Sequence, residues 1–212
     1  MLKLDCWRGG DGSLSQGGRI KEADDRSLAE VWRKFGGNLG QGGRSRASGA
    51  KKPGMKEREV LAVYQIVLEG NQVLREKSRP IPAINQAVIR LLDNLRDTLD
   101  STETGVGLAA PQIGIPKQAF VIRTEEDGYM EMINPSILRA EGQEEGWEGC
   151  LSIPDMECLV PRATKILVRY LDRAGQEREL AAEGYLARVI QHESDHLAGV
   201  LCVDRAKEIT GK

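Results

Sequence analysis

The stretch "QHESDHLAGVL", residues 191–201, contains both histidines of this 212-residue chain. His192 and His196 are four residues apart, so on a helix they share one face and lie about 5–6 Å from each other. With Glu193 they form a His-Glu-x-x-His pattern, in which two imidazoles hold a metal ion and the glutamate takes a proton from its water. The neighbouring residues are apolar, and imidazoles on an apolar face need partners for their ring nitrogens. The stretch therefore predicts a metal site on a C-terminal helix that begins near Gly184.

A catalytic metal site needs a third protein ligand and an open position for water, and two cysteines compete for this role. Cys202 stands where the metzincin pattern His-Glu-x-x-His-x-x-Gly-x-x-His has its last histidine, with Gly199 in register. Its apolar setting, "GVLCVD" (199–204), is more typical of a small buried side chain. Cys150 lies in "EEGWEGCLSIPDM" (144–156), an acidic segment that we expect to be irregular. The residues favour Cys150 but leave both thiols open as ligands.

The segment before this helix predicts one long helix followed by strands. Residues 80–102 repeat apolar side chains at the helical period, with two prolines at the entry. Four later runs alternate with turn-forming pairs, among them Asp127-Gly128 and Ala174-Gly175. The expected strands are residues 118–124, 130–138, 158–172 and 176–182. The sequence thus predicts an α+β fold, with mostly antiparallel sheets around the C-terminal helix and an N-terminal helix packed on the sheet.

The first 54 residues differ from the rest in composition. They hold half of the 24 glycines and an excess of basic residues. Such a segment buries too little apolar surface to offset its ordering entropy. We expect residues 1–54 to be a disordered or weakly ordered extension with at most one short helix, at 24–37. Residues 55–212 are then the single domain, and Met55 is the expected natural start.

Overall charge and hydropathy argue against several classes of protein. A net charge of −2 and a pI near 5.9 give no reason to expect nucleic acid or an anionic membrane as partner. No apolar run reaches the ~18 residues that span a bilayer, and the chain does not begin like an export signal. Four cysteines without close pairing fit a reducing compartment. We expect a cytoplasmic protein, because acidic residues near the N-terminus disfavour an organelle-targeting peptide.

Three separated motifs resemble those of the peptide deformylase family. They are "GVGLAAPQIG" (105–114), "EGCLSIP" (148–154) and "QHESDH" (191–196), and similar connecting segments extend the resemblance over about residues 58–205. Members of that family remove the N-formyl group from the N-terminal formylmethionine of newly synthesised polypeptides and release formate. The resemblance implies that this chain is such a hydrolase in a bacterial cytoplasm.

The resemblance also implies the metal ligands and the proton-transfer group. Cys150, His192 and His196 would bind one divalent metal, with Fe(II) expected in vivo and Zn(II), Ni(II) or Co(II) as alternatives. A thiolate ligand suits Fe(II) as well as Zn(II). Metal-bound water would attack the formyl carbonyl, with Glu193 as general acid/base.

Further roles follow for residues around the carbonyl and the peptide. Gln112 and the backbone N–H of Leu151 would form the oxyanion hole, where each donor is worth ~2.7–4 kcal/mol. Gly107 and Gly149 would bind the substrate, because glycines allow an extended peptide to lie against the backbone.

The chain departs from the family pattern at a few positions, one of them near the expected methionine pocket. Val106 and Val189 are expected to line it, with Tyr185 near its rim, where family members usually have an aliphatic residue. The segment "LEGNQVLREKS" (68–78) replaces the family's Tyr-Pro-Asp-Pro stretch, and Cys202 stands where an aromatic residue is common. None of these departures falls on an expected metal ligand.

Two other functions remain open from the residues. One is a zincin-type endopeptidase whose third ligand is Cys202 or a downstream acid. The other is a noncatalytic domain with a closed structural metal site, which needs a fourth ligand such as Cys158 or Cys202. As a deformylase, the chain would act as a monomer on nascent polypeptides close to the ribosome, without direct binding to nucleic acid or membrane.

Overall fold

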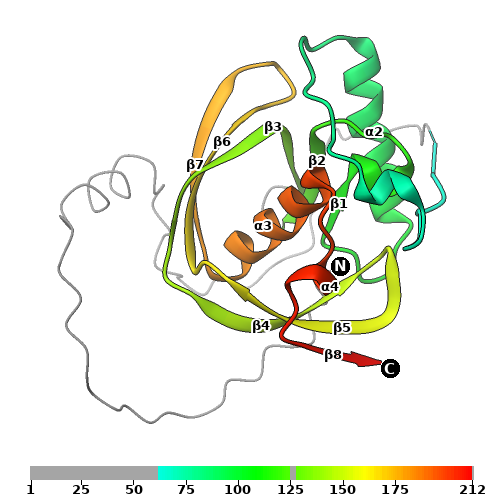
Figure 1. Cartoon of the computed structure of the whole chain (residues 1–212). Coiled ribbons are helices and arrows are strands. Elements are labelled where there is room, and N and C mark those ends of the chain that lie inside the picture. Colours follow the sequence, from blue (N-terminus) through cyan, green and yellow to red (C-terminus); the bar gives the residue numbers. More distant parts are fainter. Residues whose placement is uncertain (1–61, 125–127, 212) are drawn as a thin grey trace, which may run out of the picture.

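The structure is a computed structural model that describes residues 62–124 and 128–211. The expected extension 1–54, with its helix at 24–37, lies outside these residues, so the domain boundary at 55 stays a prediction. Figure 1 shows the arrangement of the elements. In chain order they are η2 (Gln72–Arg75), α2 (Gln86–Asp100), β1 (Gly107–Ala109), η3 (Ala110–Ile113), β2 (Ala119–Thr124), β3 (Gly128–Glu141), β4 (Glu144–Cys150), β5 (Ile153–Arg162), β6 (Lys165–Leu171), β7 (Glu177–Glu183), α3 (Gly184–Ala198), α4 (Cys202–Arg205) and β8 (Glu208–Gly211).

Two antiparallel sheets form most of the fold. The larger has five strands in the order β1-β2-β3-β6-β7, and the smaller has three in the order β4-β5-β8. Gly128 and Gly175 stand at the β2–β3 and β6–β7 connections with positive φ, a conformation that favours glycine. The predicted mixed fold with antiparallel sheets is confirmed.

The helix α2 begins at Gln86, later than the expected residue 80. The Asn85 side chain accepts hydrogen bonds from the N–H groups of Ala87 and Val88, so it caps the first turn. The helix packs against β1 and β2. Its buried apolar residues follow the predicted spacing: Val88, Leu91, Leu92, Leu95 and Leu99.

The helix α3 lies between the two sheets (Figure 1). It contacts β1, β2, β6 and β7 of the larger sheet, while its Arg188 donates to the Val160 carbonyl of the smaller one. Gly199 ends the helix with a φ of 76°, and a side chain there would overlap the backbone of Arg75. Glycine alone meets both requirements, so α3 stops just beyond its second histidine.

The two helices pack on opposite faces of the larger sheet. Phe120 and Ile122 of β2 belong to the buried cluster that includes α3, whereas Val121 belongs to the cluster around α2. This is the alternation expected of a strand covered on both faces. A third buried cluster joins Cys150 to apolar residues of β5 and α4.

Two expectations about strands were wrong. The segment 144–156, expected to be irregular, forms β4 and the start of β5, which pair with each other, and its irregularity is confined to a register shift at Cys150 and the turn that follows. The expected strand 158–172 is two strands, β5 and β6, separated by residues 163–164. The N–H and C=O groups of Ala163 both bond the side-chain amide of Gln191 on α3. Because Gln191 of α3 satisfies the hydrogen bonds of these backbone groups, the chain can leave the smaller sheet there and enter the larger one.

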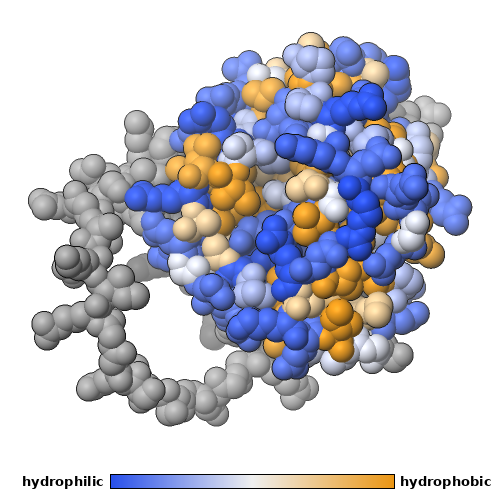
Figure 2. Space-filling view, viewed as in Figure 1, coloured by the Kyte–Doolittle hydropathy of each residue, from blue (hydrophilic) through white to orange (hydrophobic). Residues whose placement is uncertain are grey.

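The outer surface is mainly polar. Figure 2 shows a largely hydrophilic face on which apolar residues gather in separate patches. Within residues 62–124 and 128–211, no helix has the length and apolar character needed to cross a membrane.

Candidate metal centre

Cys150, His192 and His196 come together although they lie on two elements. Cys150 ends β4, and the two histidines lie one turn apart on α3 with ring centroids 5.0 Å apart. The possible ligand atoms of the three side chains all lie within 4.8 Å of one another. The Cys150 Sγ atom is 3.4 Å from His196 Nε2. All three side chains are buried, so the group is a compact set of one sulfur and two nitrogen donors.

This donor set fits a divalent transition metal. Thiolate and imidazole are the ligands that Zn(II) and Fe(II) share. Within the part of the chain that the structure describes, no fourth His, Cys, Asp or Glu joins the group, as a closed structural site would require. The same part of the chain leaves His196 Nδ1 and Glu193 Oε2 buried without hydrogen-bond partners. Buried polar atoms are nearly always hydrogen-bonded, so these two atoms show that the centre can still bind a further polar group or ion.

The second cysteine that the sequence left open, Cys202, lies outside this group. It is 3% exposed at the start of α4. A hydrogen bond with Cys202 is the main cause that holds the pKa of Cys150 well below its usual range, and the charge of His196 acts in the same direction. The same hydrogen bond and burial raise the pKa of Cys202. Of the two thiols, Cys150 therefore has the surroundings that favour the thiolate, the form that binds metals.

Glu148 orients His192, a role that the sequence interpretation missed. Its Oε2 atom lies 3.0 Å from His192 Nδ1, which turns the other ring nitrogen, Nε2, away from this carboxylate. Metal-binding histidines are commonly held by a carboxylate in this way. Burial lowers the pKa of His192, but hydrogen bonds with Cys150 and Glu148 outweigh it and raise the pKa to about 9. Glu148 lies two residues before Cys150, and on a strand this spacing places both side chains on the same face. We missed this signal because we expected the segment to be irregular.

Glu193 lies between the two histidines in sequence and against the backbone of Gly107 in space. It is 2% exposed. A Cβ atom placed on Gly107 would lie within 3.0 Å of three Glu193 side-chain atoms, so a residue with a side chain would displace the carboxylate. Burial raises the pKa of Glu193, while the charges of the two histidines oppose this. A buried carboxyl group with a raised pKa is suited to accept and return a proton.

The amide group of Gln112 has a defined orientation. Its Oε1 atom accepts the N–H of Ala109 at 2.9 Å, and its Nε2 atom donates to Ser152 Oγ at 3.2 Å. Because the backbone N–H needs an acceptor, the NH₂ end must face the centre, where it lies 3.8 Å from Cys150 Sγ. Leu151 follows Cys150 in the turn between β4 and β5. These two expected oxyanion donors therefore lie beside the cysteine.

The residues expected to bind substrate differ in how deeply they are buried. Val106 and Val189 are buried in the cluster between α3 and the larger sheet. Gly149 is buried in β4 directly before a register shift at Cys150, and such irregularities are frequent next to active sites. Tyr185, at the start of α3, is 44% exposed, and burial of the rest of its side chain raises the pKa of its hydroxyl group to about 12.

Comparison with known proteins agrees with this geometry. Residues 63–212 match the family model described as polypeptide deformylase. A peptide deformylase of Syntrophomonas wolfei is 51% identical over 148 residues, which cover 70% of this chain and 96% of that protein. The crystal structure of peptide deformylase from Thermotoga maritima gives a TM-score of 0.67 at 38% identity, covering 70% of this chain and 100% of that one.

A further solved relative carries a peptide. A class I type b peptide deformylase from Acinetobacter baumannii, solved with Met-Ala-Ser bound, gives a TM-score of 0.64 at 33% identity and covers 68% of this chain and 98% of its own. The family resemblance of the three motifs is thus confirmed. The chain belongs to the polypeptide deformylase family, whose members are enzymes that use a divalent metal to remove the N-formyl group from nascent polypeptides.

Proposed function

We propose that this chain removes the formyl group from polypeptides that begin with formylmethionine, with a metal held by Cys150, His192 and His196. The observation that carries the proposal is the buried Cys-His-His group with Glu193 beside it. A divalent metal there would supply Lewis acidity, which activates water near neutral pH. Fe(II) is the proposed metal in vivo, and Zn(II), Ni(II) or Co(II) fit the same donors.

Glu193 is the proposed general acid/base. Its buried carboxylate would take the proton from the attacking water and pass it to the amino group that leaves as the amide bond breaks. The contact with Gly107 supports this role, because it leaves space for the carboxylate but for no side chain opposite.

Gln112 and Leu151 are the proposed donors to the formyl oxygen. The NH₂ end of Gln112 is turned to the centre by its bond to Ala109. Together with the N–H of Leu151 it would stabilise negative charge on that oxygen, at about 2.7–4 kcal/mol for each donor. The bond to Ala109 orients Gln112 before substrate binds, so this donor would need little reorganisation during the reaction.

The proposed substrate lies along glycine backbone with methionine in an apolar pocket. Gly107 and Gly149 would bind the peptide backbone, and Val106 and Val189 would line the pocket, with Tyr185 near its rim. The Met-Ala-Ser peptide bound to the Acinetobacter baumannii relative supports this choice of first residue. We also propose that the chain acts as a monomer in the cytoplasm, near the ribosome.

Formate release from formyl-Met-Ala-Ser tests the proposal, with metal content measured on the same anaerobically purified protein. One metal per chain and release of formate are expected. Unformylated Met-Ala-Ser is the control, because an endopeptidase would cleave its peptide bonds. Metal-loaded protein that releases no formate would contradict the proposed function.

A further inference from the structure

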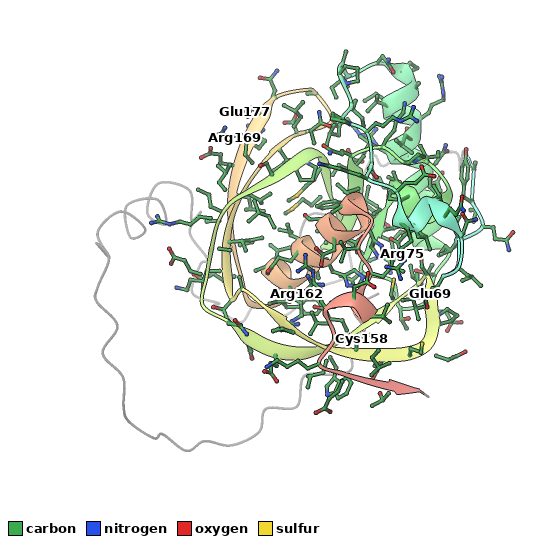
Figure 3. All side chains as sticks on the ribbon, in the orientation of Figure 1. Glu69, Arg75, Cys158, Arg162, Arg169 and Glu177 are labelled. Carbon is green, nitrogen blue, oxygen red and sulfur yellow. The ribbon has the colours of Figure 1, made fainter. Side chains whose placement is uncertain are left out.

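We propose that Arg162 is a positioning residue for His192, acting through Glu148 and held in turn by Asp195 and Arg205. This inference rests on the proposed function, because it concerns how one of the metal-binding side chains is kept in place. Arg162 ends β5, outside the three family motifs, and no role was expected for it. In Figure 3 it lies between α3 and the smaller sheet.

The carboxylate of Glu148 is held at both oxygens. Its Oε1 atom accepts from Arg162 Nε and from Arg188 Nη1, each at 2.9 Å. Its Oε2 atom accepts from Arg162 Nη2 at 2.9 Å and contacts His192 Nδ1 at 3.0 Å. The side chain of Glu148 is fully buried. Of the two arginines, only Arg162 reaches the oxygen that contacts the histidine.

Arg162 is itself fixed by a second carboxylate. Its Nη1 atom donates to Asp195 Oδ2. The same carboxylate accepts from Arg205 at both oxygens, at 2.6 and 2.7 Å. Asp195 lies on α3 one turn from His192, so the helix that presents the histidine also anchors the arginine. Arg205 joins α4 to this set, and its side chain is about half exposed (48%).

Stability alone does not account for this arrangement. Arg162 and Glu148 are both nearly inaccessible to water, and apolar residues of similar size often replace such buried ion pairs without loss of stability. A planar guanidinium that bonds two carboxylates, however, fixes their orientation in a way that neither an apolar side chain nor a lysine can. The network therefore defines where the Glu148 carboxylate lies, and with it the plane of the His192 ring and the direction of its Nε2 atom.

The variant Arg162→Lys tests this role, because lysine keeps the positive charge but lacks the planar guanidinium group that bonds both carboxylates. The chain offers a matched control in Arg173, which bonds both oxygens of Glu131 and one oxygen of Asp93, all at 2.7 Å. Arg173 is part of the network around α2 and β3 and contacts none of the proposed site residues. Both variants would be compared with the unaltered chain by circular dichroism, by Zn(II) affinity in competition with a chromogenic chelator, and by formate release.

Arg162→Lys is expected to weaken Zn(II) binding by about 10–100-fold, the range for partners of metal ligands. Arg173→Lys is expected to leave Zn(II) affinity within about twofold. A folded Arg162→Lys chain with unaltered Zn(II) affinity overturns the inference. If that variant does not fold, the partly exposed Arg205→Gln decides: weakening by about threefold or more supports the network, and unaltered affinity overturns it.

The same measurements separate this inference from the proposed function. An unaltered chain that neither binds Zn(II) nor releases formate contradicts the proposed function itself. If the unaltered chain binds Zn(II) and releases formate, and the Arg162 and Arg205 variants do so equally well, only the positioning role is contradicted.

Discussion

The backbone of Gly107 lies against the carboxylate of Glu193, so that no side chain fits between β1 and α3 at this point. The variant Gly107→Ala should therefore displace the carboxylate without removing any metal ligand. Because misplacement by about 1 Å can cost ~100-fold in rate, we expect kcat/KM for formate release to fall by at least about tenfold at full metal content. Gly211→Ala is the control, since a Cβ there meets nothing within 4 Å. Equal rates for the two variants would contradict the proposed contact.

Replacement of each thiol should separate a ligand from its neighbour. Cys150→Ala removes the only sulfur in the donor group, so bound metal and activity should both be lost. Cys202→Ala should retain the metal and lose about 1 kcal/mol of stability, as expected for a small buried group. Metal analysis and thermal melts of both variants provide the measurement. Full metal occupancy in the Cys150 variant would refute its assignment.

Glu193→Gln should separate metal binding from proton transfer. Glutamine keeps the shape that packs against Gly107 but cannot accept the proton. We expect unaltered metal content and a loss of about 10²–10⁴-fold in kcat, the usual contribution of general acid–base catalysis. An active Glu193→Gln enzyme would mean that another group carries the proton.

A shortened chain that begins at Met55 tests the expected domain boundary. If residues 1–54 contribute nothing to the core, the shortened and full chains should melt at the same temperature and release formate at similar rates. Four apolar residues of the expected helix at 24–37, Leu28, Val31, Trp32 and Phe35, provide the competing case. Their burial would contribute about 1.5–3 kcal/mol each, and a melting point lower by more than ~5 °C in the shortened chain would place the extension within the fold.

The sequence was a good guide where local signals agree with the fold. The helical spacing of α2 and α3 predicted which faces are buried, and the Ala174-Gly175 pair predicted the turn between β6 and β7. It failed at β4, where glycines and acidic residues disfavour a strand. That strand is supported by contacts distant in sequence, above all the pairing of Glu148 with Arg162.

The candidate site also contains residues that local motifs indicate and residues that only distant contacts reveal. The candidate ligands and Glu193 stand in short motifs, so the sequence could propose them, and the structure brings Cys150, His192 and His196 together. Glu148 and Asp195 stand inside these motifs and Arg162 outside them, but the sequence does not show that the three charged side chains contact one another. Only the packing of α3 against the smaller sheet brings them out of water and into contact.

The donor group draws its sulfur from β4 and its nitrogens from α3, so an ion bound there would join the smaller sheet to the central helix. Metal supply would then govern the lifetime of the protein as well as its catalysis. At a free metal concentration 100 times the dissociation constant, binding to the folded state alone adds about 2.7 kcal/mol of stability. A newly made chain in a metal-starved cell would lack that increment. It would unfold more often than the metal-bound chain, and proteases would degrade it more readily.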